Sequence, residues 1–233
     1  MSDSVVVNGR QIGPSSDLAE LLRRQIKSGT ALGQMPDEGP ETAIFALFNA
    51  SRGTALEHRL VDTATGFLTD PDPDIRRCAV DIVQQFPEMF DPVALVEVLE
   101  SQPRMFRDVP GGDNKPDLAN GLLRAAAAHP SSDDRVINRL REAAVDPRNG
   151  GWVLAGVATN DTDWVLQHVP EVVNGDANRA QILLFRLKDP VLRERLVREI
   201  PRESPQLRKL LSEAVTREIQ DPSERDRLNN LLK

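Results

Sequence analysis

The sequence has no tyrosine, only seven phenylalanines and two tryptophans, so aromatic residues make up 4% of its 233 positions. Hydrophobic residues nevertheless reach 39%, and most of them are leucine, valine, isoleucine and alanine. Aliphatic side chains of this size suit closely packed helices better than the two faces of a β-sandwich. Composition therefore favours an all-α fold in a chain of ordinary size for a folded protein.

Cysteine, histidine and long apolar runs are also scarce. The single cysteine, Cys78, excludes an intramolecular disulfide framework and a cysteine-rich metal centre. The histidines, which are His58, His129 and His168, lack the i, i+4 spacing of a helical zinc pair. No window approaches the ~18 apolar residues of a membrane span, and the first residues do not resemble a signal peptide. The sequence thus predicts a cytoplasmic protein without a metal or other cofactor.

The formal net charge of -7 is unevenly distributed along the chain. Residues 1–100 carry 16 acidic and 8 basic side chains, whereas residues 101–233 carry 20 acidic and 21 basic ones. Proteins that bind nucleic acids present basic faces to the phosphates, so the acidic half argues against nucleic acid as the partner. The same charge is suited to attract a cationic protein. We therefore predict a protein partner, while the sequence leaves its identity and the oligomeric state open.

From residue 15 onward, apolar segments of roughly 9 to 16 residues with helical periodicity alternate with breakers rich in Pro, Gly, Asp and Asn. One clear stripe consists of Ile75, Cys78, Ala79, Ile82, Val83 and Phe86. A second stripe near the C-terminus consists of Leu207, Leu210, Leu211, Ala214, Val215 and Ile219. We predict one domain of helix pairs over residues 15–233, preceded over residues 1–14 by a tail or a β-hairpin that turns at Asn8-Gly9.

Asp-Pro dipeptides recur where the apolar segments begin. In each of them the aspartate is expected to cap the free N–H groups of a helix whose first residue is the proline. The dipeptides are Asp70-Pro71, Asp91-Pro92, Asp146-Pro147, Asp189-Pro190 and Asp221-Pro222. Their irregular spacing indicates degenerate repetition of a helix pair.

The stretch LTDPDPDIRRCAVDIVQQF, residues 68–86, alternates three aspartates as a calcium-binding loop does. An EF-hand loop that starts at Asp70 needs glycine at its sixth position and glutamate at its twelfth, where this chain has Ile75 and Asp81. The two prolines between the aspartates also fix backbone conformations that such a loop does not use. We interpret the stretch as a joint between two helices and not as a metal site.

The segment DPDPDIRRCAVDIV, residues 70–83, closely resembles the turn and second helix of bacterial HEAT-like repeats, with Ile75, Arg76 and Ala79 at the matching positions. The preceding ALEHRLVDTATGFL, residues 55–68, stands where the first helix of the pair belongs. The segments DPRNGGWVLAGVA and KDPVLRERLV resemble the same turn and helix more weakly. The resemblance implies a right-handed α-solenoid whose second helices line a concave surface, on which members of the family mostly bind other macromolecules.

Candidate partner-binding residues follow from this implied surface, from the tryptophans and from a long loop. Polar residues on the helix of residues 75–86 are expected to face away from its apolar stripe, with Arg76 on the flank. An arginine there is alternatively suited to tie helix ends together. The interruption of residues 104–117, around Gly111, carries a methionine and a phenylalanine that would anchor a partner or close the preceding helix. The candidates are Arg76, Arg77, Asp81, Gln84, Met105, Phe106, Trp152 and Trp164.

No residue in the sequence is assigned a catalytic role, because Cys78 lies on an apolar stripe as a buried structural cysteine does. We predict a non-catalytic scaffold that binds another protein, for example as an inhibitor or immunity-type protein against a basic toxin or enzyme. An enzymatic alternative stays open. Some HEAT-like proteins are DNA-repair glycosylases that hold DNA with aromatic and acidic residues, a role for Trp152 or the pair Asp163-Trp164 here, and others are pigment lyases.

Overall fold

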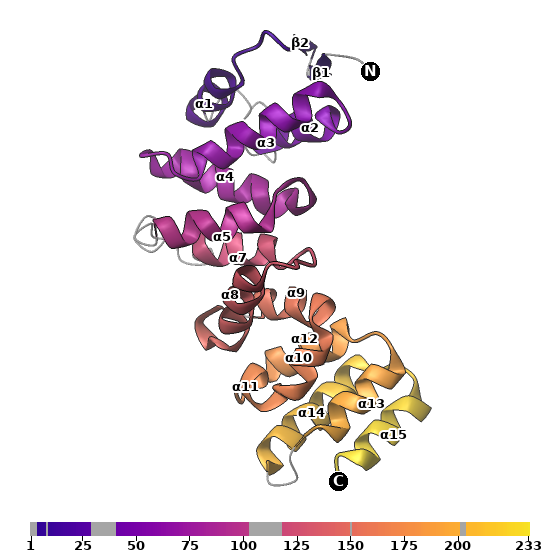
Figure 1. The fold of residues 1–233 in the computed structure, drawn as a ribbon. Coiled ribbons are helices and arrows are strands. Elements are labelled where there is room, and N and C mark those ends of the chain that lie inside the picture. The colour runs from indigo at the N-terminus through magenta and orange to yellow at the C-terminus, as the bar shows by residue number, and fades with distance from the viewer. Residues whose placement is uncertain (1–3, 8, 29–40, 103–117, 150, 201–203) are drawn as a thin grey trace. The chain divides into compact units, whose positions relative to one another are not determined.

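The computed structural model describes residues 4–7, 9–28, 41–102, 118–149, 151–200 and 204–233 (Figure 1). Within them the chain is mostly α-helical, as predicted, and no helix there is long and apolar enough to cross a membrane. The chain divides into two compact units, Met1–Ala125 and Ala126–Lys233. One repeat domain over residues 15–233 stays a prediction.

The first unit begins with the predicted hairpin, in which strand β1 (Val5–Val7) pairs antiparallel with β2 (Arg10–Ile12). Gly9, in the turn between them, has a positive φ of 75°, a conformation that glycine adopts without strain. Val5 and Ile12 are buried, and β1 packs on helix α2. The hairpin is stable because its apolar face is covered, since an isolated two-stranded ribbon is marginal in water.

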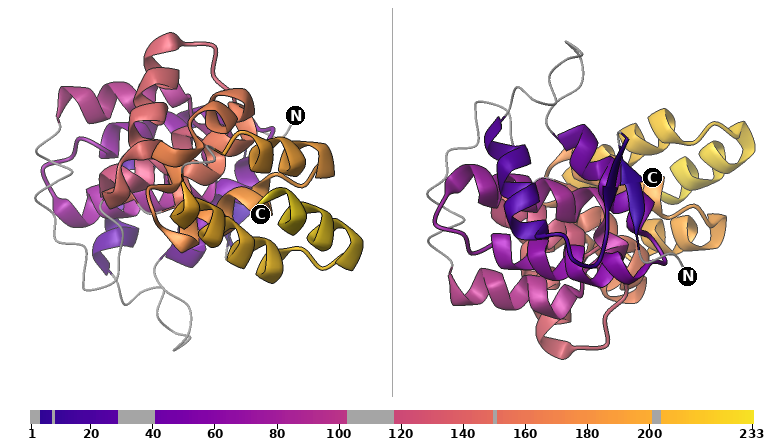
Figure 2. Two further views of the ribbon diagram at one scale, coloured as in Figure 1. Left: turned by 90° about the horizontal axis from the view of Figure 1, so that it is seen from below. Right: turned by 90° about the horizontal axis from the view of Figure 1, so that it is seen from above.

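Helices α2, α3 and α4 of the first unit pack on one another, and α1 packs on α3 and α4 (Figure 1). The hairpin and α1 lie at the same end of this unit (Figure 1), and the right-hand view of Figure 2 shows both from that end. The predicted stripe of residues 75–86 is buried, which confirms it as core. The helices are α1 (Leu18–Ser28), α2 (Glu41–Ser51), α3 (Ala55–Phe67), α4 (Pro73–Gln85), the 3-10 helix η1 (Pro87–Met89), α5 (Pro92–Ser101) and α7 (Leu118–Ala126).

In the second unit α9 packs against both α8 and α12, α12 packs on α14, and α15 contacts α13 and α14. The predicted C-terminal stripe lies on α14, where all its residues are buried except the partly exposed Leu210. The helices are α8 (Asp134–Val145), the 3-10 helix η2 (Pro147–Asn149), α9 (Trp152–Asn160), α10 (Thr162–Gln167), α11 (Val169–Val173), α12 (Ala177–Arg186), α13 (Pro190–Arg198), α14 (Pro205–Glu218) and α15 (Pro222–Leu231).

The turn between α3 and α4 is a joint, as predicted, but its capping residue differs from the prediction. Asp72 caps α4, because its Oδ1 accepts the N–H of Asp74 at 3.0 Å and Pro73 is the first helical residue. Asp70 is only 4% exposed, and its Oδ1 accepts the N–H of Asp72 at 2.9 Å. The alternating aspartates thus cap the helix and close the turn before it.

Helix α1 is fixed to this joint by two ion pairs. Arg23 binds the carboxylate of Asp70, and Lys27 binds that of Asp72. The Arg23 guanidinium also lies 4.9 Å from the ring centroid of Phe67, within the range of a cation–π interaction. Because its hydrogen bond to Lys27 favours the charged form, the pKa of Asp72 is lowered.

Three other Asp-Pro dipeptides cap helices as predicted, and one does not. Asp91, Asp189 and Asp221 accept N–H groups at the starts of α5, α13 and α15. Asp146 instead ends α8, and its carboxylate accepts the backbone N–H of Arg148 at 2.9 Å within η2. The prediction of an α-helix at that dipeptide is wrong, because only one 3-10 turn precedes α9.

Arg179 on α12 is a buried arginine, 1% exposed, that joins the ends of two helices. Its Nε donates to the carbonyl of Val172 at 2.5 Å, and its Nη groups donate to the carbonyls of Ala144 and Asp146. These carbonyls lie at the C-terminal ends of α11 and α8, where intrahelical donors are lacking. A guanidinium matches several such acceptors at once, and its charge complements the negative ends of the helix dipoles.

Candidate protein-binding site

The predicted site residues on α4 include one that is buried. Arg76 is 8% exposed, and its Nη1 donates to the carbonyls of Asp70 at 2.6 Å and Pro71 at 2.9 Å. Arg193, at the same position in α13, donates from Nε to the carbonyl of Leu187 at 2.6 Å, again six residues earlier. Both arginines fix the turn before their own helix. The expectation that Arg76 borders a solvated face is wrong.

The remaining predicted residues of α4 are partly exposed. Arg77 and Asp81 have intermediate exposure. Gln84 packs toward α7, because a Cβ on Gly121 would lie 2.7 Å from the Gln84 Nε2. Gln84 thus keeps intermediate exposure, and α7 covers part of this face. Binding of a partner by Arg77, Asp81 and Gln84 stays a prediction.

The loop predicted to anchor a partner lies outside the described residues. This applies to Met105, Phe106 and the whole of residues 104–117 around Gly111. Their proposed contribution to binding stays a prediction.

Trp164 packs among side chains of the second unit. Its ring stacks on His168 with a centroid separation of 4.6 Å, and the Arg141 guanidinium lies 5.4 Å from the same ring. The neighbouring Asp163 is exposed and pairs with Arg195 at 2.5 Å. Trp164 therefore serves to position Arg141, and Asp163 forms an ordinary surface ion pair.

Trp152 and Phe185 are the two aromatic side chains most exposed among the described residues, at 57% each. Trp152 begins α9, and Phe185 lies near the end of α12. These helices touch at Gly151, where a Cβ would lie 1.7 Å from the Ile182 Cδ1. Trp152 directly follows Gly151, and Phe185 follows Ile182 by about one helical turn, so each aromatic residue is close in sequence to this contact.

An arginine, Arg186, lies against one of these aromatic side chains, Phe185. The Arg186 guanidinium lies 5.7 Å from the centroid of the Phe185 ring. Trp152, Phe185 and Arg186 are hereafter called the aromatic surface. Tryptophan, aromatic residues and arginine are the types that dominate the binding energy of protein interfaces.

Sequence reasoning found Trp152 but missed Phe185. The signal for Phe185 was present in the periodicity of α12, whose buried positions are Arg179, Ala180, Leu183 and Leu184. Phe185 falls outside this stripe, and a large apolar side chain off the stripe faces solvent.

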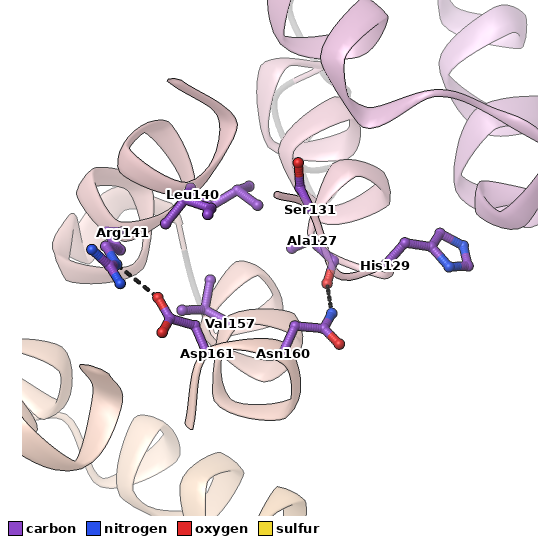
Figure 3. A pocket seen from close by; sticks show the side chains of 9 residues that line it. Ala127, His129, Ser131, Leu140, Arg141, Val157, Asn160 and Asp161 are labelled. Atoms are coloured by element: carbon purple, nitrogen blue, oxygen red, sulfur yellow. Dashed lines mark hydrogen bonds and ion pairs between the residues drawn. The ribbon is translucent and has the colours of Figure 1, made fainter. Parts of the chain in front are cut away.

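A cavity of about 100 Å³ lies between α8, α9 and the segment that precedes α8 (Figure 3). Its apolar lining consists of Ala127, Ile137, Leu140 and Val157, and its polar lining includes Ser131, Arg141, Asn160 and Asp161. The His129 imidazole points away from the cavity in Figure 3. The cavity thus has an aliphatic interior beside a polar edge.

Two hydrogen bonds hold this edge in place. The Arg141 Nε donates to Asp161 Oδ2 at 2.7 Å, and the Asn160 Nδ2 donates to the carbonyl of Ala127 at 2.9 Å (Figure 3). Gly156 lets α9 approach this segment closely, because a Cβ there would lie 2.3 Å from the Ala127 oxygen. The polar edge is therefore preformed by hydrogen bonds within the protein.

Comparisons with models of protein families, with curated proteins and with solved structures give no match. Within the described ranges, His, Cys, Asp and Glu side chains form no group of three able to hold a metal ion. Fold and site define a mostly α-helical protein with an exposed aromatic surface and a small preformed cavity.

Proposed function

We propose that this chain is a HEAT-like helical-repeat protein that binds another protein and performs no catalysis. The aromatic surface is the observation that carries the proposal. Two aromatic side chains that are 57% exposed are each close in sequence to one helix contact, and one of them lies against an arginine. A partner that covers them removes a large apolar area from water and gains aromatic and cation–π contacts.

The equivalent joints support the HEAT-like arrangement. Arg76 and Arg193 occur at the same position after a capping Asp-Pro, and each donates to the carbonyl six residues earlier. Sequence-distant segments with the same turn, cap and arginine are typical of repeats that arose from one supersecondary unit.

A cationic protein is the partner that fits the charge of the chain. Residues 1–100 carry twice as many acidic as basic side chains, 16 against 8. Such a surplus raises the local concentration of a basic partner and speeds its association. This acidic surplus fits a chain that acts as an inhibitor or immunity-type protein against a basic toxin or enzyme.

Affinity capture from a lysate of the native cell tests the proposal with three baits. They are the wild type, the double variant Trp152→Ser/Phe185→Ser, and Val6→Ser as a control for loss of another exposed apolar side chain, which is 66% exposed. All baits must show the same helical circular dichroism. We expect a protein retained by the wild type and the control but lost with the double variant. The proposal is contradicted if no protein is retained specifically, or if all three baits retain the same protein equally.

The enzymatic alternative, a HEAT-like DNA-repair glycosylase or a pigment lyase, gains no specific support from the described residues. Asp163, the acidic residue beside Trp164, is exposed and paired with Arg195. Binding of duplex DNA at low salt that Trp152→Ala weakens, or a coloured product on coexpression with a chromophore pathway, would favour that alternative over ours.

A further inference from the structure

The size and interior of the α8–α9 cavity match one branched aliphatic side chain. Its volume is about 100 Å³, and its apolar lining comes from Ala127, Ile137, Leu140 and Val157. An apolar cavity of about 150 Å³ holds benzene, so this smaller one suits valine or leucine better than an aromatic ring. Leu140 on α8 and Val157 on α9 are buried, so two packed helices supply this interior.

The polar edge offers both hydrogen-bond donors and acceptors, which is what a peptide backbone requires. Within the described residues, Arg141 forms its hydrogen bond through Nε, so the Nη groups remain as donors at the edge. Asp161 Oδ1 and Asn160 Oδ1 are acceptors that the two edge hydrogen bonds do not use. Trp164 supports the Arg141 guanidinium at 5.4 Å, so the donors are held in place.

The charge of the edge favours a ligand that is itself uncharged. Arg141 and Asp161 are paired at 2.7 Å, so their charges cancel at the mouth of the cavity. A neutral pair gives a carboxylate, a phosphate or an ammonium group no net attraction to offset the cost of leaving water. A neutral amide backbone carries no charge to desolvate.

We propose that the α8–α9 cavity receives a valine or leucine side chain from a peptide segment of the partner, whose backbone hydrogen-bonds with Arg141, Asn160 and Asp161. This proposal rests on the protein-binding function proposed above. It names a second point of attachment, set by shape and hydrogen bonding, in addition to the aromatic surface.

Capped amino acids test the cavity without the partner. N-acetyl-N′-methylamides of leucine, valine, glycine, phenylalanine and aspartate are titrated into the full chain, and methyl NMR signals of Leu140 and Val157 are followed. Leucine and valine probes should give saturable shifts with Kd on the order of millimolar, as expected for ligands of this size. Glycine, phenylalanine and aspartate probes should give at least tenfold weaker binding.

Two variants separate a specific site from general surface contact. Ile137 is partly exposed at the cavity, so Ile137→Trp should fill it, remain folded and abolish the leucine shifts. Leu192→Trp, a partly exposed position on α13 away from the cavity, should leave them unchanged. The proposal is overturned if the leucine probe causes no saturable shift, or if the glycine, phenylalanine or aspartate probe binds as well as leucine. If the leucine probe causes no saturable shift while Trp152→Ser/Phe185→Ser still abolishes partner capture, the cavity proposal is wrong and the proposed protein-binding function stands.

Discussion

At the scale of single residues, two helical glycines should respond in opposite ways to the same substitution. Gly156→Ala places a Cβ 2.3 Å from the carbonyl oxygen of Ala127, a backbone atom that has no room to move aside. We expect a loss of about 1–3 kcal/mol in the free energy of unfolding. Gly66→Ala meets no atom within 4 Å and should stabilise the chain by about 0.5–1 kcal/mol. Urea denaturation of both variants checks this, and changes of the same sign would contradict the account.

Asp146 should make stability depend on pH in the acidic range. Its hydrogen bond with the Arg148 side chain, aided by the Arg148 backbone N–H, lowers the pKa of Asp146 from 3.8 to about 2. A lowered pKa in the folded state means that the stabilisation is present above about pH 4 and is lost as the pH falls toward 2. The difference in unfolding free energy between wild type and Asp146→Asn should therefore shrink over that interval.

Arg148→Gln provides the matching control for this titration. It removes the principal partner, so the pKa of Asp146, measured by NMR on the carboxyl carbon, should rise toward 3.8. An unchanged pKa in this variant would show that the ion pair is not the cause.

The sequence predicted helix caps better than it predicted exposed sites. Asp91, Asp189 and Asp221 cap helices as expected, because an Asp-Pro dipeptide determines its local structure through its own side chain and ring. The cap of α4 was assigned to Asp70 because two consecutive Asp-Pro dipeptides, at residues 70–71 and 72–73, compete for the helix start. The packing of Gln84 toward α7 was not predicted for a related reason, since α7 comes from a segment far along the chain.

At the scale of elements, Arg179 should be essential for holding α8, α11 and α12 together. Arg179→Met keeps much of the length of the side chain but leaves the carbonyls of Ala144, Asp146 and Val172 without this donor. Buried acceptors without partners cost about 1–3 kcal/mol each, so we expect a loss of about 3 kcal/mol or more in the free energy of unfolding.

A surface arginine on α14 supplies the control for that variant. Arg217 is exposed, so Arg217→Met should change the free energy of unfolding by less than about 0.5 kcal/mol. Equal effects of the two substitutions in thermal or urea unfolding would contradict the capping role of Arg179.

Helical periodicity predicted the cores of α4 and α14 because buried positions recur every three to four residues in each. It did not predict which helices meet. The contact of Gly151 with Ile182 joins segments about 30 residues apart, and no local pattern encodes it. The cavity likewise depends on the close approach of α9 to the segment around Ala127, which Gly156 allows.

At the scale of the whole molecule, the acidic first half should control how quickly the partner binds. If steering by the surplus acidic side chains of residues 1–100 speeds association, the association rate should fall roughly tenfold or more between about 20 and 500 mM salt, because salt screens the attraction. Stopped-flow mixing with the captured partner measures this rate. A rate independent of salt would rule out a cationic partner guided by charge.

The measurement that tests the central claim most directly is calorimetric titration of the captured partner into the wild type and into Trp152→Ser/Phe185→Ser. Because buried aromatic anchors at an interface contribute about 2 kcal/mol each, we expect a loss of about 4 kcal/mol and therefore a rise of roughly 1,000-fold in Kd for the double variant. Val6→Ser should retain the wild-type Kd. Equal Kd values for the wild type and the double variant would show that the aromatic surface is not where the partner binds.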